Sequence, residues 1–261
     1  MASALYAALA LHFWRRRPPA PSGGMAAWER AAILAPVLLH ATLLHREIFA
    51  QDELRFGFAF ALSAMLWMTA LIYWLESFFY DLDALQPPVL ALAAIAAPLP
   101  ALFPGKIGGG YTAALEFKLH LVLAMMAYSL FTIALLHALL MAILERRLHQ
   151  KDRAAIGGLP PLLTLERLLF RLIGAAFVFL TLTLATGMAF SESLFGRAMR
   201  FDHKTVFAVL SWGTFGLLLG GRRLYGWRGR TALRWTLSGF VLLLLAYIGS
   251  RFVLEVILGR P

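Results

Sequence analysis

The chain has 261 residues, of which 61% are hydrophobic and 15% are charged, and its net charge is +10. Soluble domains carry roughly 45–50% apolar and about 25% charged residues, so the composition excludes an ordinary soluble domain and predicts a polytopic membrane protein. Because the arginines cluster in short links between apolar segments, the positive charge indicates cytoplasmic loops and not nucleic-acid binding. The chain contains no cysteine, which excludes disulfide bonds and thiolate metal sites.

The apolar segments predict an all-α polytopic membrane protein, a bundle of about eight transmembrane helices that forms a single integral membrane domain over residues 1–261. A crossing needs about 20 apolar residues to span a hydrocarbon layer of roughly 30 Å. The expected crossings, in chain order, are 2–14, 28–49, 56–79, 87–103, 115–144, 168–190, 206–219 and 233–258. The seventh reaches full length if residues 201–205 begin it at the membrane surface.

Two of these segments have distinctive features. The first is short and is followed, not preceded, by Arg15-Arg16-Arg17. This order argues against a signal peptide and favours a retained helix whose N-terminus lies outside. The fourth contains Pro98 and Pro100, which predict a kinked or partly broken helix whose freed backbone groups are satisfied by neighbours.

The distribution of basic residues predicts the orientation. With the N-terminus outside, fifteen of the 24 Lys and Arg residues lie in inner links or at inner helix ends. Since the positive-inside rule places such residues in the cytoplasm, we expect both termini on the outer side.

Histidines in the outer half of the bundle are the main candidates for chemistry. His120 lies five residues inside the fifth crossing, about 7 Å below the outer edge, and His45 lies at a similar depth in the second. His40 is about one turn deeper, and His203 stands at the outer mouth of the seventh. Because imidazole is the usual axial ligand of haem iron, these four predict a haem site. A hydrogen bond to a neighbouring helix is the alternative role for each.

Other polar residues carry weaker signals. His137 lies seventeen residues beyond His120, about 25 Å farther along the helix and roughly 100° round it, so the two do not share a ligand. Asp202, beside Lys204, is either a functional anion–cation pair or a cap at a helix start. No hydrolytic triad, metalloprotease helix or nucleotide motif occurs, and we predict that the chain is not an enzyme.

Ordered motifs between residues 115 and 257 carry a resemblance to a known family. They are Leu119-His120-Leu121 with Met125-Met126-Ala127-Tyr128-Ser129, then Asp202-His203-Lys204-Thr205, and then Gly226-Trp227-Arg228-Gly229-Arg230. The set resembles the CcsA-type cytochrome c assembly family, in particular its shorter, eight-crossing YpjD/HemX-like branch. Where the family carries a second outer histidine, this chain has Gly249-Ser250-Arg251-Phe252.

The resemblance implies a bundle in a bacterial plasma (inner) membrane that binds haem b near its outer face. It further implies an accessory role in cytochrome c assembly or haem homeostasis, with cytochrome c maturation components or a haem-synthesis enzyme as partners. His120 is the expected axial ligand. The second ligand is expected to be His40, or else His203 or His45, with Asp202 beside the haem.

Two other functions stay open at this point. One is a haem-independent regulator that docks a cytoplasmic haem-synthesis enzyme through the basic links 146–153 and 222–230. The other is a small-solute transporter, for which the proline-broken fourth segment is the only indication.

Overall fold

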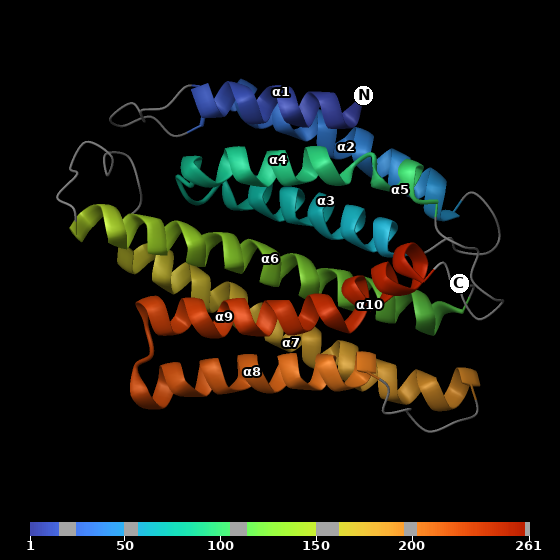
Figure 1. The fold of residues 1–261 in the computed structure, drawn as a ribbon. Helices are drawn as coiled ribbons and strands as arrows, with labels where there is room; N and C mark the ends of the chain where they lie inside the picture. The colour runs from blue at the N-terminus through green and yellow to red at the C-terminus, as the bar shows by residue number, and fades with distance from the viewer. Residues whose placement is uncertain (16–24, 50–56, 105–113, 150–161, 196–202, 259–261) are drawn as a thin grey trace.

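The structure, a computed structural model, describes residues 1–15, 25–49, 57–104, 114–149, 162–195 and 203–258. They form a bundle of long helices that run side by side (Figure 1). The helices are α1 (Ala2–Arg15), α2 (Ala27–Phe49), α3 (Phe58–Glu76), α4 (Gln86–Ala96), α5 (Leu99–Leu102), α6 (Leu115–His149), α7 (Leu162–Phe195), α8 (His203–Tyr225), α9 (Gly229–Leu244) and α10 (Ser250–Phe252). A 3₁₀ turn at Asp83–Leu85 precedes α4, and π-helical segments at Leu245–Gly249 and Val253–Ile257 flank α10.

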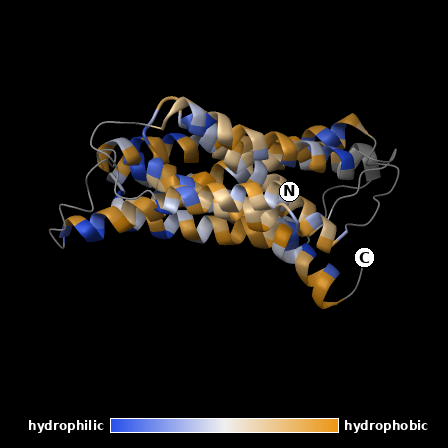
Figure 2. Cartoon of the chain, turned by 90° about the horizontal axis from the view of Figure 1, so that it is seen from above, coloured by the Kyte–Doolittle hydropathy of each residue, from blue (hydrophilic) through white to orange (hydrophobic). Residues whose placement is uncertain are grey.

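The predicted membrane architecture is confirmed. Within the described residues, seven helical stretches are long and apolar enough to cross a membrane. Figure 2 shows hydrophobic residues along the bodies of the helices and hydrophilic ones mainly towards the two ends. The 14 residues of α1 extend about 21 Å, less than the hydrocarbon thickness, so the first predicted segment falls short of a full span.

The break in the fourth segment is also confirmed, and α1 explains how the bundle tolerates it. Helix α4 ends at Ala96, and α5 resumes at Leu99, just after Pro98. Because proline has no N–H, the carbonyl of Ala94 loses its intrahelical donor at Pro98. The hydroxyl of Ser3 on α1 donates to that carbonyl at 2.7 Å. A neighbouring helix thus satisfies the freed acceptor, as the hydrocarbon environment requires.

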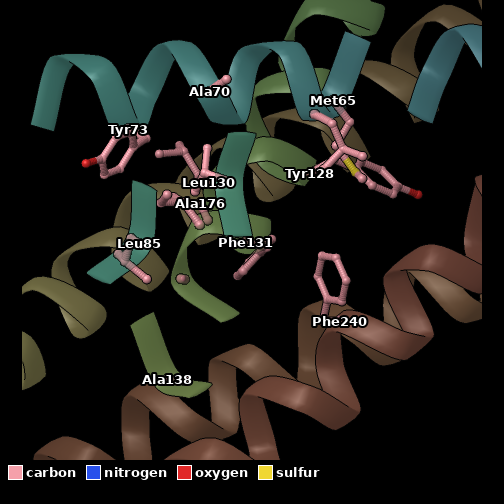
Figure 3. Packing of buried hydrophobic residues seen from close by; sticks show 14 of the residues in the cluster. Met65, Ala70, Tyr73, Leu85, Tyr128, Leu130, Phe131, Ala138, Ala176 and Phe240 are labelled. Carbon is pink, nitrogen blue, oxygen red and sulfur yellow. The ribbon is translucent and has the colours of Figure 1, made fainter. Parts of the chain in front are cut away.

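Helices α3 and α6 form the centre of the bundle. In the most apolar stretch of α6, 67% of the residues are buried, whereas in that of α8 only 22% are buried, so α8 lies at the periphery. The Ser129 hydroxyl of α6 donates to the carbonyl of Met65 on α3 at 3.0 Å, and Figure 3 shows the buried side chains of the two helices together. Phe131 of α6 stacks on Phe215 of α8 with ring centroids 3.7 Å apart. Gly239 of α9 leaves room for the Phe215 ring.

Helix α9 is hydrogen-bonded to α6 just before the π-helical segment that follows it. The Tyr128 hydroxyl donates to the carbonyl of Leu243 at 2.6 Å, and Tyr128 is buried. We expect Tyr128→Phe to lower the free energy of unfolding by about 0.6–1.7 kcal/mol, the range for hydrogen bonds between membrane helices. Unfolding of the detergent-solubilised protein by SDS measures this. Tyr225→Phe, at an exposed side chain, is the control, and equal effects in both variants would contradict the prediction.

Candidate functional site

His120 lies on the second turn of α6 and faces α7. Its Nδ1 is 3.0 Å from the hydroxyl oxygen of Thr186. The next residue, Gly187, lets the ring approach closely, because a Cβ there would lie 3.2 Å from Cε1 of His120. The imidazole is therefore set against α7 by a hydrogen bond and by the absence of one side chain, and it stays half-buried.

The hydrogen bonds around Thr186 indicate which nitrogen of His120 carries the proton. The Thr186 hydroxyl lies 2.8 Å from the carbonyl of Leu182 and 3.1 Å from that of Thr183. A hydroxyl has one hydrogen, and a carbonyl only accepts. If that hydrogen is donated to the backbone, the Thr186 oxygen accepts from Nδ1–H of His120. The lone pair then resides on Nε2, which is the form in which a neutral imidazole ligates a metal.

An aromatic contact joins α8 to a different face of α7, since Thr181 and Phe177 lie about 140° and 180° round the helix from Thr186. The indole N–H of Trp212 donates to the Thr181 hydroxyl at 2.9 Å, and the Trp212 ring stacks on Phe177 with centroids 5.6 Å apart. His203, nine residues before Trp212, begins α8 at the end of the bundle where His120 lies, and it is exposed. Asp202, the other site residue predicted there, lies outside the described residues.

The remaining predicted ligands lie on α2, away from the partners of His120. His40 is 1% exposed, with Nε2 2.9 Å from the Ser63 hydroxyl of α3 and its ring edge-on to Tyr6 of α1, 5.8 Å between centroids. His45 is exposed near the C-terminal end of α2. The structure thus sets His40 between α1 and α3 and His120 against α7, and does not bring the two together.

Two buried charged sites are absent from the sequence predictions. Glu76 of α3 faces His137 of α6, with Oε2 and Nε2 3.8 Å apart. Glu166 of α7 forms ion pairs with Arg222 and Arg228. The signal for Glu76 was available, since an ionisable residue at the end of an apolar segment is a functional candidate by default. Within the described residues, no group of three or more His, Asp or Glu side chains is placed to hold a metal ion.

The pairing of Glu166 bears on the basic link 222–230. Arg222 and Arg228 both pair with Glu166 of α7, but only Arg222 is partly buried, while Arg223, Arg228 and Arg230 are exposed. The arginines of this link that a partner protein can reach are therefore the exposed ones. The hypothesis of a haem-independent regulator therefore depends on the exposed arginines, and it stays a prediction.

Comparisons with known proteins agree with this architecture. The family model described as Cytochrome C assembly protein matches residues 28–258. The chain is 35% identical over 173 residues to "Inner membrane protein YpjD" of Escherichia coli, an alignment that covers 66% of this chain and 65% of that protein. It is 35% identical over 181 residues to a 28.8 kDa protein of Azospirillum brasilense, covering 69% and 67% respectively.

A shorter match connects the chain to a longer relative. Over 86 residues it is 31% identical to "Cytochrome c biogenesis protein CcsA" of Trichormus variabilis, covering 33% of this chain and 24% of that protein. No solved structure gives a significant match.

Proposed function

Because this chain belongs to the cytochrome c assembly protein family, we propose that it binds haem b in the membrane and acts as an accessory to cytochrome c assembly or haem homeostasis. In this proposal it handles haem and catalyses no reaction of its own. His120 is the axial ligand that the chain supplies. The haem brings the iron chemistry, while the protein fixes the orientation of the ligand and a dry surrounding.

The hydrogen bond between His120 and Thr186 carries this proposal. Membrane helices use histidine either to bond a neighbouring helix or to ligate a metal. At His120 the bond to α7 involves Nδ1, which leaves the lone pair of Nε2 for iron when Nδ1 carries the proton. A hydrogen bond of this kind, made by the ring nitrogen that does not bind the metal, fixes the tautomer and the ring orientation of metal-bound histidines.

His203 is the better supported second ligand. The Nε2 of His40 is already 2.9 Å from Ser63, and its ring is enclosed by α1 and α3. His203, in contrast, is exposed at the start of α8, which packs on the Thr181 and Phe177 side of α7. Along α8, His203 lies about 13 Å from Trp212, and along α7, Thr186 lies about 7 Å from Thr181, the residue that Trp212 contacts. Both lie towards the same end of the bundle. His203 and His120, which bonds Thr186, therefore differ in depth by about 6 Å.

We further propose that the protein lies in the inner membrane with its N- and C-termini outside. One end of the bundle, at the left of Figure 1, holds the end of α1, the start of α2, the end of α6, the start of α7, the end of α8 and the start of α9. These are the helix ends that carry Arg15, Arg30, Arg146, Arg147, Arg167, Arg222, Arg223, Arg230 and Arg234. The positive-inside rule assigns this end to the cytoplasm.

An absorption spectrum of the detergent-purified protein, reduced minus oxidised, tests the haem assignment. From cells supplied with haem, the wild type is expected to show sharp low-spin bands that His120→Ala loses almost completely. His203→Ala is expected to retain haem with altered, partly high-spin bands, because one axial ligand remains. His149→Ala is the matched control, since His149 lies exposed at the other end of α6 and bonds its own backbone at Glu145.

Two results would contradict the proposal. A colourless wild type would argue against haem binding as a whole. Unchanged bands in His120→Ala would show that another residue ligates the iron, and the same bands lost in His40→Ala would identify the enclosed histidine as that residue.

A further inference from the structure

A second polar site, unrelated to His120, lies in the opposite half of the bundle. Glu76 ends α3, and His137 lies on the parallel helix α6. Oε2 of Glu76 and Nε2 of His137 are 3.8 Å apart, with the two side chains 13% and 0% exposed. Both atoms are buried and neither has a hydrogen-bond partner. Buried polar atoms without partners are costly, so this pair requires an explanation.

The other nitrogen of His137 determines what the ring presents to Glu76. Nδ1 lies 2.9 Å from the carbonyl oxygen of Ile133. Since a carbonyl only accepts, Nδ1 must carry a hydrogen in every protonation state of the ring. In the neutral ring, the Nε2 lone pair therefore points at the Glu76 carboxyl group. An ionised carboxylate opposite this lone pair would bring two acceptors together with no donor between them.

A single proton removes this conflict. On Glu76 it makes a carboxylic acid that donates to Nε2, and on His137 it makes an imidazolium that donates to the carboxylate. Two protons would leave an uncompensated positive charge between the buried helices, and none would leave two facing acceptors. Because Glu76 is the partly exposed member, a small rotation of its side chain shortens the gap to hydrogen-bond length.

We infer that Glu76 and His137 form a membrane-buried proton-binding site that holds one shared proton between α3 and α6. The ligand is a proton taken from the inner aqueous side, since the partly exposed Glu76 lies at the basic end of the bundle. The inference rests on these two side chains and not on haem binding, so it stands or fails independently of the proposed function.

Charged and titratable groups on the surrounding elements either contact other residues or are exposed. Arg30 of α2 lies over the ring of Phe78, 5.1 Å from its centroid, and Asp83 of the 3₁₀ turn accepts from Gln86 at 2.9 Å. The Tyr73 hydroxyl of α3 lies 3.5 Å from the carbonyl of Leu82. On the other elements packed against α6, Glu166 of α7 is paired with Arg222, and Arg234 of α9 is exposed. These contacts leave the shared proton to Glu76 and His137.

Counting the protons on the pair tests the inference. Infrared spectroscopy reports a protonated carboxyl group, and ¹⁵N spectra of histidine-labelled protein report the charge of the His137 ring, assigned with Glu76→Gln and His137→Asn variants. At neutral pH, one of two states is expected: protonated Glu76 with neutral His137, or ionised Glu76 with imidazolium His137. Ionised Glu76 with a neutral ring, or protonated Glu76 with an imidazolium, would overturn the inference.

The variants add a readout that does not depend on the assignment. In Glu76→Gln the amide N–H₂ donates to Nε2 permanently, so we expect the wild-type thermal midpoint to be kept and the titration of the His137 ring to shift or vanish. Glu145→Gln is the control, because Glu145 lies on α6 about two turns beyond His137. It is expected to leave the titration of the His137 ring unchanged. An unchanged His137 titration in Glu76→Gln would also overturn the inference.

Discussion

Arg222→Ala is expected to destabilise the protein by about 2–3 kcal/mol. Arg222 of α8 pairs with Glu166 of α7, whose side chain is 9% exposed. Its guanidinium also lies over the Phe170 ring, 4.6 Å from the centroid, and donates to the carbonyl of Trp227 at 3.4 Å. Removing one member of a buried pair costs about 3–5 kcal/mol because a buried charge is left behind.

The expected loss is smaller than that range for two reasons. The Arg222 side chain is 25% exposed, so water already screens the pair, and Arg228 stays 3.4 Å from Glu166. SDS-induced unfolding of the detergent-solubilised protein measures the change. Arg223→Ala, at the exposed neighbouring arginine, is the control and is expected to be nearly neutral.

A double-mutant cycle separates the ion pair from the lost packing. If the buried charge causes the loss, Glu166→Gln combined with Arg222→Ala should be less destabilised than the sum of the single variants. Strict additivity would instead attribute the effect to the contacts of Arg222 with Phe170 and Trp227. Equal stability of the Arg222→Ala and Arg223→Ala variants would refute the role of the pair altogether.

The second large effect is expected at Gly221, where two consecutive glycines provide their own control. A Cβ at Gly221 would lie 2.4 Å from the Trp227 ring, whereas a Cβ at Gly220 would have no atom within 4 Å. We expect Gly221→Ala to cost about 1–3 kcal/mol by overpacking. Gly220→Ala is expected to be neutral or to stabilise the helix by up to about 1 kcal/mol, the difference in helix propensity.

The turn between α8 and α9 explains why the Trp227 ring cannot move aside. The indole stacks on Trp235 with centroids 5.2 Å apart, and its backbone N–H donates to the carbonyl of Gly221 at 3.3 Å. Gly226 and Gly229 on either side have φ of 65° and 52°, a conformation that other residues adopt at a cost. The unfolding midpoints of the two alanine variants in SDS give the comparison. A Gly221→Ala variant as stable as Gly220→Ala would mean that the turn is softer than this packing implies.

The two predictions concern one structural unit at the basic end of the bundle. Trp227, Arg222 and Glu166 connect the end of α8, the start of α9 and the start of α7. Loss of either contact is expected to loosen this end while leaving the surroundings of His120 at the opposite end intact. The haem spectrum of the Arg222→Ala variant is therefore expected to match that of the wild type.

The crossings were predictable from the sequence because each depends on local properties. Length and apolarity alone determine whether a segment enters the hydrocarbon layer, so seven stretches and the break at Pro98 agree with the sequence prediction. Helix ends were less certain: α7 runs over Leu162–Phe195, beyond the predicted 168–190, because polar residues such as Glu166 continue the helix outside the apolar core. The ordered motifs likewise identified the family.

Which faces of these helices meet was decided only by the tertiary structure. Lipid and protein core are equally apolar, so a membrane helix shows little of the periodicity that marks the buried face of a soluble helix. The sequence therefore placed His40, His45, His120 and His203 at comparable depths but did not reveal that His40 bonds Ser63 while His120 faces Thr186. For the same reason Glu76 and His137, 61 residues apart in the chain, were recognisable as a pair only once α3 and α6 were packed together.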